Sequence, residues 1–185
     1  MALTLESRIP LNDGRTIPVL GLGVWQTAPG RETRQAVRYA LEIGYRLIDT
    51  ARMYGNEKDV GAAVRESGIP REGIFVTTKL WNDEHGYEAA LRAFEKSRQA
   101  LGLDYVDLYL VHWPKPSLDR DVATWRAFER LHADGRARAV GVSNFQAAPA
   151  ALARRDTRGP GGESDRAASR ASAGAAAPAR GHRRR

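Results

Sequence analysis

The sequence alternates short apolar runs with longer amphipathic segments, and this alternation most constrains its fold. Five apolar runs have the length and composition of buried strands, at Val19–Val24, Tyr45–Thr50, Ile74–Leu80, Val106–Val111 and Ala139–Ser143. Four segments between them have helical periodicity, at Arg31–Ile43, Glu57–Ser67, Tyr87–Leu101 and Val122–Leu131. Strands and helices that alternate about every 30 residues are typical of βαβ units, so the sequence predicts an α/β fold with a parallel sheet.

The region before this alternation, Ile9–Pro18, is predicted to form a short hairpin. Asn12, Asp13 and Gly14 supply the residue types that a tight turn needs. The first predicted strand contains the run Gly-Leu-Gly, but Gln26 occupies the place of the third glycine of a dinucleotide-binding loop. The sequence therefore disfavours a Rossmann fold.

The C-terminal part of the chain has a different composition. After Leu152 it contains no Val, Ile, Leu, Met, Phe, Tyr or Trp, and such a segment cannot bury enough apolar surface to become ordered. We therefore expect a folded part at residues 1–150 and a disordered tail, rich in Arg, Ala and Gly, at 151–185. Residues 154–185 hold nine Arg against three acidic residues, so most of the net charge of +7 belongs to the tail. The folded part is nearly neutral, and nucleic-acid binding is not expected.

Composition also limits the chemistry and the location. Cysteine is absent, which excludes disulfides and cysteine-based metal sites or nucleophiles. His85, His132 and His182 have no ligand-like spacing, so no metal site is predicted. The N-terminus lacks the apolar core of a signal peptide, and no apolar run approaches the length of a membrane span. We expect a cytoplasmic protein without membrane contact.

Polar residues that can carry chemistry fall where successive predicted strands end: Asp49, Tyr54, Lys79 and His112. The C-terminal ends of parallel strands share one rim, so these four groups should converge. The ammonium of Lys79 should lower the pKa of the Tyr54 phenol, and Asp49 should keep that lysine charged. With His112 orienting a carbonyl oxygen, the set suits carbonyl reduction with a general acid.

Each of these residues also has an ordinary structural interpretation. A strand-end aspartate often caps a helix or pairs with a cation, a single histidine is often a core or surface residue, and a strand-end lysine can be solvated. Trp25, Trp81 and Trp113 follow three predicted strands and could line an apolar pocket, although core packing is the commoner role of tryptophan.

Several motifs together resemble the aldo-keto reductases, and within them the bacterial reductases of the 2,5-diketo-gluconate reductase type. The run GYRLIDTARMYGNEKDVG is followed by VTTKLWN, LDYVDLYLVHWP and VGVSNF, in the family's order, and the resemblance covers about residues 8–146. It implies a (β/α)8 TIM barrel with an N-terminal hairpin, of which this sequence carries the hairpin and about the first five strands and four helices. It also implies reduction of aldehydes or ketones with NADPH.

The resemblance implies roles for individual residues. Tyr54 resembles the family's proton donor, and Asp49, Lys79 and His112 resemble its three partners. The cofactor-binding positions it implies are Val24, Asp49, Ser143 and Asn144, of which the last two resemble the pair that binds the nicotinamide carboxamide. The substrate-binding positions it implies are Trp25, Trp81, His112 and Trp113.

The sequence also departs from the family. Arg52 stands where the family usually has a small residue beside the active-site rim. More importantly, a complete barrel needs about 250 residues, and here the pattern ends after five strands. Nothing resembles the family's later strands, its adenosine-phosphate-binding segment or its C-terminal substrate loop.

A shifted reading frame would account for this loss. Residues 156–169, DTRGPGGESDRAAS, can be encoded by nucleotides that give TRGVPAVNQIELHP when they are read one position later. VPAVNQIELHP resembles the family's sixth-strand region. We therefore hypothesise that the frame was lost between about Gln146 and Arg158. A nucleotide sequence incompatible with the shifted frame would contradict this.

The sequence is also compatible with other functions. The chain could be a catalytically inactive remnant of such an enzyme, because the two outer strands of a five-stranded sheet expose unpaired backbone groups. The family is typically monomeric, but a fragment of this kind could self-associate. The Arg-rich tail could contact a nucleic acid or an anionic surface, a weaker interpretation because an out-of-frame tail from a GC-rich gene would have the same composition.

Overall fold

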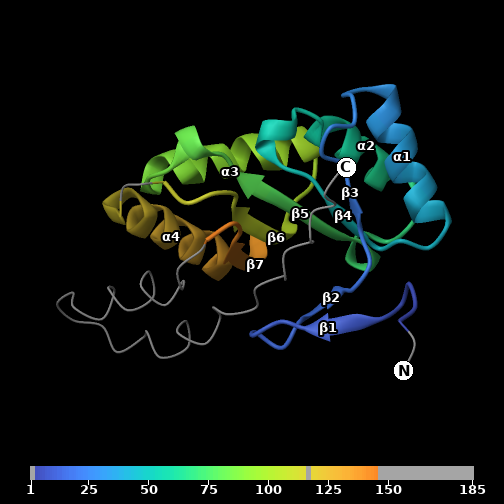
Figure 1. The fold of residues 1–185 in the computed structure, drawn as a ribbon, viewed down its shortest axis with the longest axis horizontal. Coiled ribbons are helices and arrows are strands. Elements are labelled where there is room, and N and C mark those ends of the chain that lie inside the picture. Colours follow the sequence, from blue (N-terminus) through green and yellow to red (C-terminus); the bar gives the residue numbers. More distant parts are fainter. Residues whose placement is uncertain (1–2, 116–117, 146–185) are drawn as a thin grey trace, which may run out of the picture.

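The computed structural model describes residues 3–115 and 118–145 of the 185-residue chain. The chain opens with a small antiparallel hairpin of β1 (Arg8–Pro10) and β2 (Thr16–Pro18), which lies apart from the larger sheet (Figure 1). The larger sheet is built from β3 (Leu22–Gly23), β4 (Leu47–Asp49), β5 (Phe75–Leu80), β6 (Val106–Val111) and β7 (Ala137–Val142). The α-helices are α1 (Arg31–Glu42), α2 (Glu57–Glu66), α3 (Tyr87–Leu101) and α4 (Leu118–Ala133). Short 3₁₀ turns are η1 (Arg52–Tyr54), η2 (Arg71–Gly73) and η3 (Asn82–Glu84).

The five strands of the larger sheet lie in chain order, β3-β4-β5-β6-β7, and each pairs in parallel with its neighbour. A helix connects each strand to the next, as parallel pairing requires. This confirms the predicted parallel α/β fold with a hairpin, five strands and four helices. Within the described residues, β3 and β7 are the outer strands of the sheet.

Some boundaries differ from the prediction. The first strand is only Leu22–Gly23; Leu20 before it is exposed, and Gly21 packs closely on Leu47. Pairing nevertheless continues past its end, since Val24 N donates to Asp49 O at 3.0 Å. The last strand and the last helix both begin a few residues earlier than predicted.

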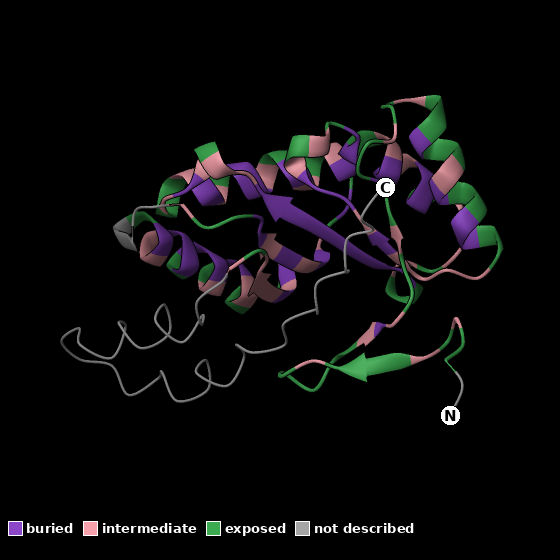
Figure 2. Cartoon of the chain, in the orientation of Figure 1, coloured by how far each residue is buried: buried purple, intermediate pink, exposed green. Residues whose placement is uncertain are grey.

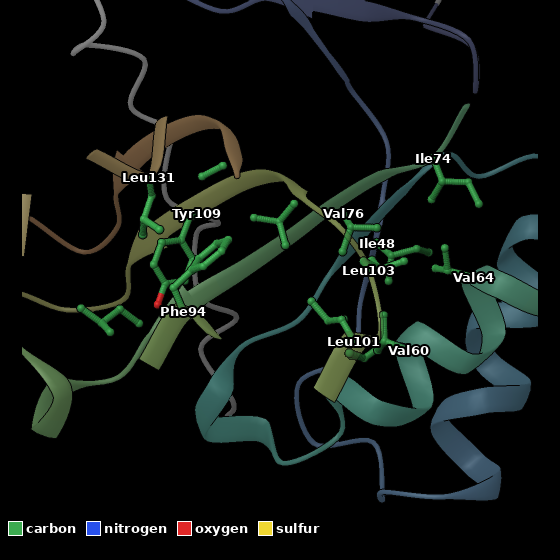
Figure 3. Close-up of a cluster of buried hydrophobic side chains, with 14 of the residues drawn as sticks. Ile48, Val60, Val64, Ile74, Val76, Phe94, Leu101, Leu103, Tyr109 and Leu131 are labelled. Carbon is green, nitrogen blue, oxygen red and sulfur yellow. The ribbon is translucent and has the colours of Figure 1, made fainter. Parts of the chain in front are cut away.

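The hydrophobic core lies between the sheet and its helices. The rings of Phe94 on α3 and Phe128 on α4 contact Tyr109 on β6, with ring centroids 5.0 and 4.5 Å apart. Figure 3 shows Val60 and Leu101 packed together in the same cluster. All six residues of β5, the central strand, are buried, whereas the hairpin is largely exposed (Figure 2). The sheet is therefore anchored by β5, the strand that carries Lys79.

Gly61 permits the close approach of α2 to the end of α3. A Cβ atom at this position would lie 1.8 Å from the carbonyl oxygen of Leu101, which belongs to the backbone and cannot easily move. We expect Gly61→Ala to destabilise the chain by about 1–3 kcal/mol, the range for overpacking a core. Urea unfolding measures this, and Gly23→Ala, where no atom lies within 4 Å, is the matched control. Equal stability of both variants would contradict the predicted contact.

Candidate active site

The four candidate catalytic residues lie at the C-terminal ends of three adjacent strands. Asp49 ends β4, Tyr54 ends the turn η1 that follows β4, Lys79 lies one residue before the end of β5, and His112 follows β6 directly. The β4–β5 and β5–β6 pairings put these strand ends side by side. The structure therefore brings the four groups together at one rim, as the sequence predicts.

Lys79 is the centre of the cluster. Its buried Nζ forms an ion pair with Asp49 Oδ1, donates to Thr50 O at 3.0 Å, and donates to the Tyr54 hydroxyl at 3.5 Å. An ammonium has three N–H groups, and these three acceptors use all of them. Lys79 is thus held in one orientation, with its charge against the phenol oxygen.

Aromatic rings surround the histidine. The ring of His112 meets Tyr54 edge to face, with centroids 5.7 Å apart, and meets Trp81 in the same manner at 5.2 Å. His112 Nδ1 is buried and has no hydrogen-bond partner among the residues described. Burial, with a smaller contribution from the charge of Lys79, lowers the pKa of His112 to about 4. The imidazole is therefore neutral at pH 7.

The pKa of Tyr54 differs from the sequence-based prediction. We expected Lys79 to lower it, but burial, with a smaller contribution from the Asp49 carboxylate, raises it to about 12. Burial likewise lowers the pKa of Lys79 and raises that of Asp49, and in each the attraction between the two opposes the shift. The prediction was wrong because it considered the lysine charge and neglected desolvation of the phenolate.

A buried asparagine that the sequence argument missed holds the loop with Tyr54. Asn56 accepts a hydrogen bond from Thr50 Oγ1 at 2.8 Å and donates to Val24 O at 2.9 Å and Thr27 Oγ1 at 3.2 Å. It thereby ties the end of β4 to the segment after β3. No local sequence pattern marks this role, because the partners of Asn56 lie up to 32 residues away.

Ser143 and Asn144 lie at the same rim, immediately after β7. Ser143 N donates to Val111 O at 2.8 Å, which continues the β6–β7 pairing. Ser143 Oγ and Asn144 Nδ2 both donate to His112 O, at 2.6 and 2.8 Å. Asn144 has a left-handed backbone (φ 62°), which asparagine tolerates better than most residues. The two polar side chains are thus side by side next to the histidine.

The remaining predicted residues have different environments. Trp25 and Trp113 are 61% and 46% exposed, so they are available to a ligand. Val24 is fully buried in the core, where its carbonyl binds Asn56. At Arg52, where the sequence departs from the family, the Nε atom lies 3.9 Å from Glu84 Oε1 in the turn η3.

The described residues contain no group of three or more His, Asp or Glu side chains suited to hold a metal ion. They also contain no helix that is long and apolar enough to cross a membrane. The predicted tail and the hypothesised loss of reading frame lie outside these residues and stay predictions.

The neutral state of His112 can be tested directly. A proton NMR titration should give a midpoint of about 4 for this ring, with His112→Gln used to assign its signal. Because the folded chain binds this proton more weakly than the unfolded chain, stability should fall as the pH drops below about 6.5. A midpoint at the ordinary histidine value would contradict the buried, Lys79-facing placement.

Comparison with known proteins identifies the family. The model of the aldo/keto reductase family matches residues 19–160. An aldo-keto reductase of Mycolicibacterium smegmatis is 55% identical over 142 residues, which are 77% of this chain and 51% of that protein. The crystal structure of an aldo/keto reductase from Brucella melitensis superposes with a TM-score of 0.75 at 54% identity, over 80% of this chain and 57% of that one. The protein is a member of the aldo-keto reductase family, a family of oxidoreductases.

A third similarity concerns the cofactor. A mutant of the protein Gox0644, whose crystal structure is a complex with NADPH, superposes with a TM-score of 0.73 at 44% identity, over 82% of this chain and 54% of that one. The described residues thus correspond to part of the family's TIM barrel. The chain spans about half the length of the relatives it matches.

Proposed function

We propose that this chain carries the catalytic part of an NADPH-dependent aldo-keto reductase, which reduces aldehydes or ketones to alcohols. The observation that carries the proposal is the cluster in which the buried Nζ of Lys79 binds Asp49, Thr50 and Tyr54 at once. A lysine held by a carboxylate and directed at a phenol is suited to proton donation, since it stabilises the phenolate that remains afterwards.

Tyr54 is the proposed proton donor. With a pKa of about 12, the phenol keeps its proton at neutral pH until a stronger base is formed. When hydride adds to a carbonyl carbon, the oxygen becomes an alkoxide, which is a stronger base than this phenolate. The Tyr54 O–H bond then breaks, and the proton passes to that oxygen. Lys79, 3.5 Å from the phenol oxygen, stabilises the charge left on it.

His112 is proposed to orient the carbonyl. Because its Nδ1 is buried without a partner among the described residues, a proton there would be an unsatisfied buried donor. We therefore assign the single proton of the neutral ring to Nε2. From that position an N–H can donate to the substrate oxygen without adding a charge that would compete with Lys79.

NADPH supplies the hydride when it is bound. Ser143 and Asn144 fit its nicotinamide carboxamide chemically, since a hydroxyl and an amide lie 3.3 Å apart at the rim beside His112. Both now donate to the His112 carbonyl, so an incoming carboxamide would replace that acceptor. Val24 and Asp49 remain predicted cofactor neighbours, and Val24 is fully buried in this structure.

The partner of this site is proposed to be a small carbonyl compound. Trp25, Trp81 and Trp113 would give its binding site an apolar wall, and an apolar wall excludes water from the charge-separated transition state. A cytoplasmic location, a folded unit at residues 1–150 with a separate tail at 151–185, and self-association of the chain remain predictions.

A second candidate function is that of an inactive remnant. One observation favours it: within the described residues, β3 and β7 are the outer strands of an open sheet. The test is the loss of NADPH absorbance when the 185-residue chain is mixed with a simple aldehyde. Turnover that depends on protein concentration supports the reductase, and its absence in a folded sample supports the remnant.

A further inference from the structure

A buried histidine and aspartate form a pair outside the four proposed catalytic groups. His85 Nδ1 lies 2.9 Å from Asp121 Oδ1, and the two side chains are 0% and 9% exposed. Buried polar groups are costly unless they bind each other, so this pair needs a close and specific fit. His85 lies in the loop from β5 to α3, and Asp121 lies in the first turn of α4.

Two further hydrogen bonds join the same segments. Gly86 N donates to Thr124 Oγ1 at 2.8 Å, and the buried Thr124 hydroxyl in turn donates to Arg120 O at 2.7 Å. Lys115 N, in the loop before α4, donates to Asp121 Oδ1 at 3.5 Å. Asp121 therefore holds both the loop after β5 and the loop after β6, while Thr124 adds a second link to the former.

These two loops carry two of the proposed substrate-facing tryptophans. Trp81 opens the β5–α3 loop four residues before His85, and its ring packs on His112. Trp113 follows His112 in the β6–α4 loop, two residues before Lys115. Because His85 and Lys115 both bind Asp121 Oδ1, the movement of the two indole rings relative to each other is limited.

We propose that His85 and Asp121 are positioning residues that fix the spacing of Trp81 and Trp113, and so determine the size of carbonyl substrate that the site accepts. The link between the loops stands on the geometry alone, whereas the consequence for substrate size rests on the proposed reductase function.

The bond needs no charge on the histidine. Burial lowers the pKa of His85, and Lys115 and Arg120 act in the same direction against the opposing attraction of Asp121. A neutral ring that donates from Nδ1 satisfies the carboxylate. The His85 Nε2 is buried without a partner among the described residues. In this tautomer Nε2 carries a lone pair, and burying an unpaired lone pair costs less free energy than burying an unpaired N–H. An asparagine amide can reproduce the Nδ1–H donor, which supplies a conservative variant.

The first test does not depend on activity. Fluorotryptophan labelling gives ¹⁹F NMR signals for the four tryptophans, and hydrogen exchange reports on the loops. In the full chain, His85→Leu should accelerate amide exchange at residues 81–86 by about fivefold, the factor for one lost hydrogen bond. It should also shift or broaden the signals of Trp81 and Trp113 while that of Trp25 stays unchanged. His85→Asn should restore both. Unchanged exchange and spectra in His85→Leu would overturn the link.

The second test concerns substrate size. The quantity measured is the ratio of kcat/KM for a bulky aromatic aldehyde to kcat/KM for a small aliphatic aldehyde. In His85→Leu this ratio should change by about fivefold. The change should come from KM, while kcat for the small aldehyde is kept. Asp121→Leu, which has a similar volume but removes the acceptor oxygens, should do the same if His85→Leu fails to fold. An unchanged ratio in a variant with loosened loops would overturn the role in substrate choice. If the wild-type chain has no turnover, the reductase proposal is contradicted, and so is the role of His85 in substrate choice. The link between the two loops is still decided by hydrogen exchange and ¹⁹F NMR.

Discussion

Tyr54→Phe should lower kcat for aldehyde reduction by about 10²- to 10⁴-fold, the usual contribution of a positioned general acid. The substitution removes one hydroxyl, and with it the proton that the alkoxide must receive. KM should change little, because no apolar contact of the ring is lost. Stability should change by no more than about 1 kcal/mol, because the bond lost to Lys79 is long, at 3.5 Å.

The matched control for this variant is Tyr39→Phe. Tyr39 lies on α1 and is exposed, so its hydroxyl has no place in the proposed chemistry. Turnover is followed by loss of NADPH absorbance, and thermal unfolding checks that both variants are folded. Turnover by Tyr54→Phe at the rate of the Tyr39→Phe control would contradict the assignment of the proton donor.

Much of the fold could be predicted because it depends on local pattern. Each predicted strand is present because its apolar run has residues to bury against the helices and neighbouring strands, most completely in β5, where all six residues are buried. The exact ends could not be predicted, because they depend on contacts between distant residues. The first strand, for example, pairs only at Leu22 and Gly23, with Ile48 and Asp49 of β4.

In the candidate active site, too, the features that depend on local pattern could be predicted and those that depend on distant contacts could not. The convergence of Asp49, Lys79 and His112 followed from parallel pairing alone, since strand ends in such a sheet share one rim. The pKa of Tyr54 did not follow, because it depends on how much water the fold removes from the ring. The His85–Asp121 pair did not follow either, because the two residues are 36 positions apart and neither belongs to a strand-end pattern.

Asp49→Asn should destabilise the chain by about 3–5 kcal/mol at pH 7, because it leaves the buried ammonium of Lys79 without its countercharge. The pKa of Lys79, which burial already lowers, should fall further in this variant. The folded variant then binds fewer protons than the unfolded chain, whose lysine keeps a pKa of about 10.4. Its stability should therefore increase as the pH rises toward that value, and the difference from wild type should shrink.

Chemical unfolding between neutral and alkaline pH measures this dependence, and a second variant separates the charge from the packing. Lys79→Met removes the cation but leaves Asp49, whose side chain is 35% exposed and can be hydrated, so the loss of stability should be smaller. In the double variant no buried charge remains, and stability should recover above that of Asp49→Asn alone. Additive losses in the double variant, or a deficit of Asp49→Asn that is constant with pH, would contradict an ion pair that keeps Lys79 charged beside Tyr54.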